Sequence, residues 1–188
     1  MAIVPVQLRI LQRLTEHLER LNPDDIVAPD ADDITYDLRG KVYRGRRVFG
    51  DQDDTALVTI VEAPKPEPWD AADVYEMMGQ VSWLLLVQGR EAAVDDPAAA
   101  EAAHPTDRVY WLKAAVEKQL SRIVELSDGA RRPLYPDEFM LGEKLISGFS
   151  ISPGVVAGPD GEKVGQAFFY IPLLVKYAVE LKQPYVTV

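Results

Sequence analysis

The chain has 188 residues, of which 47% are hydrophobic and 27% charged, and this is enough to form the core of one domain. It contains no cysteine, which excludes disulfide bonds, thiolate nucleophiles and cysteine-ligated zinc. The net charge of −10 argues against a nucleic-acid-binding protein, because such binding depends on cations that replace counterions along the phosphates.

The apolar stretches give no sign of export or of membrane insertion. The N-terminal sequence MAIVPVQLRILQRL carries arginines within its apolar part, unlike the uninterrupted core of a signal peptide. The longest apolar runs, residues 83–87 and 171–175, are far too short to cross a bilayer. We therefore expect a protein that is made in the cytoplasm and does not enter a membrane.

Residues 4–21 have the apolar spacing of an amphipathic helix. Leucines 11, 14, 18 and 21 recur on one face, and Pro5 suits the first turn. Asn22-Pro23 predicts the end of the helix, because the residue before a proline avoids the α region. His17 lies in this helix without a second histidine at metal-ligand spacing, so we expect it to be solvated.

The next part of the chain is predicted to form strands joined by charged or proline-rich loops. A strand is predicted over 34–43, followed by the basic loop 44–47 and a β-branched strand over 56–62. Three prolines in 64–68 exclude a central strand there, because proline lacks the amide donor. The sequence QVSWLLLVQ at 80–88 is apolar over most of its length and predicts a strand buried on both faces.

Two helices are predicted after this strand. The first is short and alanine-rich, over 97–103, with a proline in its first turn. The second is long, over 106–126, and begins at a threonine that is a fair N-cap. Asp128-Gly129 supplies the glycine that commonly ends a helix.

The last sixty residues differ in character from the rest. Residues 131–136 are linker-like, and 144–156 are predicted to be extended. Pro159-Asp160-Gly161 predicts a tight turn before a strand over 167–175, since glycine takes the positive φ that such a turn requires. The whole pattern predicts an α+β fold that ends in a C-terminal β-hairpin extension.

The sequence offers little for catalysis or for a cofactor. It contains no phosphate-binding loop, no GxGxxG and no GxSxG nucleophile motif. The aspartate stretches 30–33 and 51–54 resemble the start of a calcium loop, but neither continues into its glycine and distal glutamate. Such aspartates also serve as solvated turn formers. We therefore expect no catalytic residue, metal or cofactor, and a protein that is not an enzyme.

The three tryptophans divide between two roles. Trp83 lies in a strand pattern and Trp111 in a helix pattern, so both are expected in the core. Trp69 follows the proline-rich loop, where an exposed aromatic side chain would anchor an interface. A packed loop tip is the alternative for Trp69.

The order of elements resembles the tail terminator and head-to-tail joining proteins of long-tailed bacteriophages. An N-terminal helix precedes the strand ALVTIVEAP and the buried strand QVSWLLLVQG, and the helices DPAAAEAA and DRVYWLKAAVEKQLSRI follow. The resemblance implies a mostly antiparallel sheet with two amphipathic helices packed on one face. It covers about residues 4–126 of a predicted core over 1–126, and it leaves 127–188 as an extension without a counterpart.

The function implied by the resemblance is mechanical. Subunits would form a homo-oligomeric ring, a hexamer, that caps the tail tube, stops its elongation and joins it to the head. The partners would be the tail tube protein and a neck or head-completion protein, within the virion. DNA would pass through the lumen without specific binding, since excess carboxylates repel phosphates.

The interface positions follow from loops and turns that are expected to be exposed. They lie in the basic loop, in the proline-rich loop and in the C-terminal hairpin: Arg44, Arg46, Arg47, Phe49, Trp69, Pro159, Asp160 and Phe168. The arginines would pair with acidic patches on a neighbouring subunit, because complementary charges orient protein contacts. A solvated turn is the alternative for the basic loop.

Three other functions remain open at this point. The chain could be another neck or tail-completion protein of the same particle. It could be a non-viral protein-binding module that uses the C-terminal hairpin as an exposed edge strand. It could also be a carboxylate-dependent hydrolase or a metal protein built on the aspartates at 51–54.

Overall fold

A computed structural model describes residues 3–22, 36–47, 56–63, 80–92, 106–127, 130–133, 146–157, 166–178 and 185–187. In chain order its elements are β1 (Ile3–Pro5), α1 (Val6–Glu19), β2 (Val42–Arg44), β3 (Leu57–Glu62), β4 (Gln80–Ala92), α3 (Asp107–Ser121), β5 (Val124–Ser127), β6 (Ala130–Pro133), β7 (Ile146–Ile151), β8 (Val155–Ala157), β9 (Gln166–Ala178) and β10 (Tyr185–Thr187). The fold is α+β, as the sequence predicts.

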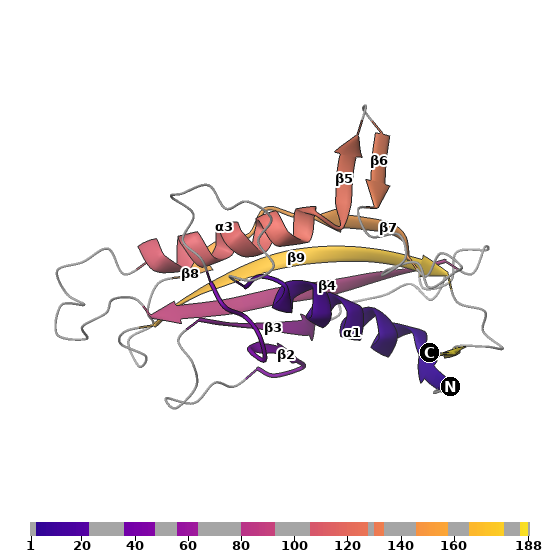
Figure 1. Cartoon of the computed structure of the whole chain (residues 1–188), viewed down its shortest axis with the longest axis horizontal. Helices are drawn as coiled ribbons and strands as arrows, with labels where there is room; N and C mark the ends of the chain where they lie inside the picture. The colour runs from indigo at the N-terminus through magenta and orange to yellow at the C-terminus, as the bar shows by residue number, and fades with distance from the viewer. Residues whose placement is uncertain are drawn as a thin grey trace.

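One mixed, mostly antiparallel sheet of six strands dominates the fold (Figure 1). Its order is β2-β3-β4-β9-β7, and β8 also pairs with β9. Among the strand pairs that the structure describes in this sheet, β2–β3 alone is parallel. The two longest strands, β4 and β9, pair along their whole length, from Gln80 opposite Ala178 to Ala92 opposite Gln166. The strand predicted over 80–88 is confirmed and extends to Ala92.

Both helices pack on one face of this sheet, as the sequence predicts (Figure 1). Alternate residues of β4 and β9 point to that face, and Leu85, Phe169 and Ile171 among them are fully buried. From α1 and α3 the same core receives Val6, Ile10, Leu14, Leu18, Val109, Leu112, Val116 and Leu120. Each fully buried side chain of this kind contributes about 1.5–3 kcal/mol, so the apolar stripe fixes the helices to the sheet.

The opposite face of the sheet has a small apolar cluster of its own. Leu57 and Phe168 are buried there, and Tyr43 and Tyr170 pack against them partly buried. The buried strand β3 thus contributes side chains to both faces, in keeping with its run of apolar and β-branched residues.

A reciprocal pair of hydrogen bonds joins α1 to α3. His17 Nε2 donates to the carbonyl of Gln119 at 2.6 Å, since a carbonyl can only accept. Gln119 Nε2 donates to the carbonyl of His17 at 2.8 Å. Both side chains are buried, so the expectation of a solvated His17 was wrong. The histidine lies on the apolar stripe because its ring satisfies a carbonyl of the facing helix.

The ends of both helices differ from the prediction. Val4 pairs with Val186 in the β1–β10 ladder, so α1 begins two residues later than position 4. The long helix ends at Ser121, and β5 then pairs with β6. Asp128-Gly129, predicted to end this helix, lies outside the described residues. The predicted linker 131–136 accordingly begins inside β6.

The strand predicted over 34–43 is also mostly wrong. Residues 36–41 form a turn in which Asp37 accepts hydrogen bonds from the backbone and the guanidinium of Arg39. Gly40 takes a φ of +67°, which disfavours other residues. Within the described residues 36–44, Val42–Arg44 forms the strand, because this side-chain bond and the glycine turn the chain before it.

The C-terminal segment supplies a central strand of the sheet. The prediction of extended structure over 144–156 and 167–175 is confirmed by β7, β8 and β9. The sheet therefore runs across the boundary predicted at residue 126 between core and extension. The strands β7 and β8, which both pair with β9, are separated by residues 152–154. Pro172 of β9 lies opposite this break and has no amide to donate. Its carbonyl accepts a hydrogen bond from the Ser152 amide at 2.9 Å.

Candidate interaction surfaces

The predicted basic loop is held against the sheet. Gly45 takes a φ of +70°, and its amide donates to the Ile60 carbonyl at 2.8 Å. The guanidinium of Arg46 lies 4.6 Å from the centre of the Tyr43 ring, a cation–π contact. Arg46 is therefore engaged within the chain, and it is partly buried.

Two arginines of this loop keep exposed side chains. Arg44 is exposed, and Arg47 is exposed while one of its Nη atoms donates to the Glu62 carbonyl at 3.2 Å. The structure thus brings Arg44, Arg46 and Arg47 to one corner of the sheet, at the end of β2. Of the other predicted interface residues, Phe49, Trp69, Pro159 and Asp160 lie outside the described residues. Phe168 is buried against Leu57, so it is not the exposed contact residue that was expected.

Two large aromatic side chains stand exposed on the first turns of α3. Tyr110 is 54% exposed and Trp111 is 55% exposed, so the prediction of a core Trp111 was wrong. The apolar stripe of this helix runs through Val109, Leu112 and Val116, and position 111 lies off it. The helical spacing alone places Trp111 outside the buried stripe, but the size and apolar character of tryptophan suggested burial.

The residue before β8 is fixed to α3. The amide of Gly154 donates to Glu117 Oε1 at 3.4 Å, and Glu117 pairs with Lys113 at 2.8 Å. Lys113 lies one turn from Tyr110 along α3. Val155, the next residue after Gly154, is exposed. We name Tyr110, Trp111 and Val155 the aromatic end.

A second set of exposed apolar residues lies around the chain termini. Ile3, Leu8 and Tyr185 are exposed, and β1 and β10 pair with Pro5 opposite Tyr185. We name these three residues the terminal end. Figure 1 shows the start of α3 and β8 toward one end of the long axis and both chain termini toward the other. The molecule thus carries two unlike apolar surfaces at opposite ends, and sequence patterns indicated neither.

The loop beneath α3 contains a tyrosine with a perturbed ionisation. The pKa of Tyr36 is raised to about 12, chiefly by burial and then by the Glu91 carboxylate, while Arg108 opposes the rise. The Tyr36 hydroxyl donates to the Arg108 carbonyl at 3.1 Å. Glu91 is itself buried on β4. This group of residues ties the loop after α1 to the first turn of α3.

The described residues contain no group of three or more histidines, aspartates or glutamates that could hold a metal ion. The aspartate stretches 30–33 and 51–54 and His104 lie outside the described part of the chain. Within the ranges that the structure covers, no helix is long and apolar enough to span a membrane.

Comparison with known proteins finds no matching family model and no significant match to a curated protein.

Proposed function

We propose that this chain is an assembly protein that forms a ring through end-to-end contacts between identical copies. The observation that carries the proposal is the pair of unlike apolar surfaces at opposite ends of the molecule. Exposed tyrosine and tryptophan side chains are characteristic of interface centres, because they bury a large area at a low entropic cost. A contact between unlike surfaces is heterologous, and it closes into a ring when the rotation per subunit divides a full turn.

The biological role that fits such a ring is that of a phage tail terminator. The element order α1, β3, β4 and α3 and the packing of both helices on one face of the sheet agree with what the resemblance implies. A sixfold ring would stack on the last ring of tube subunits and stop elongation. The excess of carboxylates, 30 against 20 basic residues, would let DNA pass without adhesion.

A second candidate function uses the edge of the sheet. Strand β7, with the sequence ISGFSI, pairs with β9 on one side and has no strand partner on its other side among the described residues. It carries neither the charge nor the proline that commonly protects an exposed edge. A binding module would use this edge to add a peptide strand.

Native mass spectrometry of the purified chain, with electron microscopy of the same sample, separates the two candidates. A ring protein gives a closed oligomer of defined number, and Trp111→Ala weakens its assembly about tenfold or more, as expected for an interface centre. Glu62→Gln is the control, because its side chain is exposed and lies on β3 opposite Leu85, near the middle of β4. A monomer or dimer that binds peptides through β7 would contradict the ring.

A further inference from the structure

The outer edge of β7 is open over a short stretch. β7 is the last strand in the order of the six-stranded sheet, and β9 is its strand partner in the part of the chain that the structure describes. The register shifts between Ile146 and Gly148, so the regular ladder runs from Gly148 to Ile151. Pro153, which has no amide to donate, lies just beyond. This edge can therefore accept a short strand.

Two apolar side chains of β7 lie at the rim of the core. Phe149 and Ile151 are partly buried and pack against the core between the sheet and the helices. They lie opposite Val175 and Leu173 of β9, which are fully buried. Because side chains alternate between the two faces of a strand, apolar residues at every second position of an added strand would cover Phe149 and Ile151. The edge thus favours apolar residues on its helix side.

A lysine of β9 reaches this edge on the opposite face of the sheet. Lys176 is exposed and lies opposite Gly148. A Cβ atom at Gly148 would lie 3.4 Å from Lys176 Cβ, 3.6 Å from Cγ and 3.5 Å from Cδ, so three successive carbons of the lysine lie over the glycine. They can lie there because position 148 has no side chain. The lysine stem thus brings its ammonium group to the open edge of β7.

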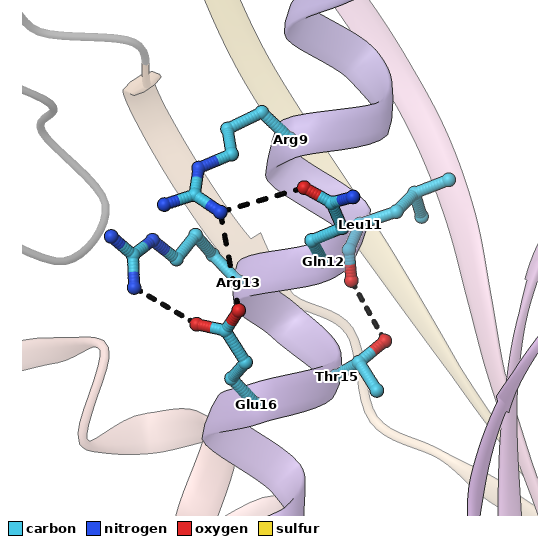
Figure 2. A network of polar contacts seen from close by, with 6 residues as sticks. All are labelled: Arg9, Leu11, Gln12, Arg13, Thr15 and Glu16. Carbon is cyan, nitrogen blue, oxygen red and sulfur yellow. Dashed lines mark hydrogen bonds and ion pairs between the residues drawn. The ribbon is translucent and has the colours of Figure 1, made fainter. Parts of the chain in front are cut away.

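Several other cations of the described residues have a carboxylate partner within the chain. Arg13 Nη1 lies 2.9 Å from Glu16 Oε2, and Figure 2 shows this pair on α1. Lys113 Nζ lies 2.8 Å from Glu117 Oε1 on α3. Lys176, by contrast, has no ion pair among the residues that the structure describes. Its charge is therefore available to a carboxylate of another molecule.

We propose that the β7 edge binds an extended segment of a partner protein in which apolar and acidic residues alternate. The apolar residues cover Phe149 and Ile151, and an acidic residue on the other face pairs with Lys176. A lysine beside an edge keeps unselected strands away, and this lysine admits a strand that brings a carboxylate. The proposal rests on strand addition at β7, the second candidate function above, and it identifies the chemistry of the strand and the residue that selects it.

Two short synthetic peptides test this selection, one alternating valine with glutamate and the other alternating valine with lysine. Fluorescence anisotropy with the full chain should show about fivefold tighter binding of the acidic peptide, as expected for a cross-strand charge pair. Lys176→Glu should reverse the preference, because a carboxylate at this position repels glutamate and attracts lysine. Arg44→Glu makes the same change of charge on β2, at the other edge of the sheet, and should keep the preference.

Hydrogen exchange locates the bound peptide, because an added strand bonds the outward amides of β7. Amides within 146–151 should exchange more slowly with the acidic peptide. An acidic peptide with two adjacent prolines at its centre should give no such protection. Binding of neither peptide, or equal binding of both, overturns the proposal. Slow exchange at 146–151 in the chain alone, increasing with its concentration, would show a second copy at the edge and would also overturn the proposal.

Native mass spectrometry of Lys176→Glu separates this contact from the ring. The variant should keep the oligomeric state of the unchanged chain, since Lys176 belongs to neither the aromatic end nor the terminal end. A chain that forms rings without binding the acidic peptide overturns the strand contact alone, and a monomer that binds this peptide overturns the ring alone. Thermal unfolding verifies that the variant folds. Lys176→Gln, which should abolish the preference without reversing it, replaces a Lys176→Glu chain that does not.

Discussion

Substitution of Gly89 by alanine tests the close packing between the two longest strands. Gly89 lies opposite Phe169 in the β4–β9 ladder, and a methyl group at Gly89 would overlap the Phe169 ring. The ring is fully buried, so it cannot move into solvent to make room. Overpacking of a filled core costs about 1–3 kcal/mol, and we expect Gly89→Ala to lower the free energy of unfolding by this amount.

Urea unfolding measures this loss, with Gly148→Ala as the control. A methyl group at Gly148 would lie 3.4 Å from Lys176 Cβ, an ordinary contact, so the control should lose much less stability. Phe169→Leu in the Gly89→Ala background removes the obstructing ring and should recover part of the loss. Equal stability of Gly89→Ala and the unchanged chain would refute the packing between β4 and β9.

Three further predictions concern single groups. Tyr36 has a pKa of about 12 when folded against 10.0 when unfolded, so the unfolded chain releases this proton first and the free energy of unfolding falls as pH rises from 10 to 12. Unfolding titrations of Tyr36→Phe should show a smaller fall over that window, and an identical fall would contradict the assignment. Asp37 has its pKa lowered from 3.8 to about 2 by hydrogen bonds from Arg39, so its contribution is present above pH 3.8 and is lost as pH falls to 2. Asp37→Asn should remove this acid dependence in the same titration. Gln119→Ala leaves the His17 carbonyl without its side-chain donor and should cost about 1–3 kcal/mol in urea unfolding, whereas Lys118→Ala, exposed beside it, should cost little.

The sequence predicted those elements whose signal is local. The strand at 80–88 and the strand at 56–62 are bounded apolar runs, and both are present. The stripe of α3 likewise follows from its helical spacing. The predictions that were wrong concern segments whose structure depends on contacts with residues distant in the chain. Val4 leaves the helix because residues 185–187 pair with it, and nothing near position 4 indicates this.

The candidate surfaces were predicted less well for a similar reason. The basic loop carries a visible charge pattern, and two of its arginines are exposed. The exposure of Trp111 was missed because residue type outweighed its position on the helix.

Disulfide trapping tests the end-to-end contact most directly, because the chain has no cysteine of its own. Trp111→Cys places a thiol at the aromatic end, and Leu8→Cys places one at the terminal end. Under mild oxidation the mixture of the two variants should give a covalent dimer far faster than either variant alone, since unlike ends meet. Equal yields from the mixture and from the single variants, or rapid dimers of Trp111→Cys by itself, would contradict a head-to-tail ring.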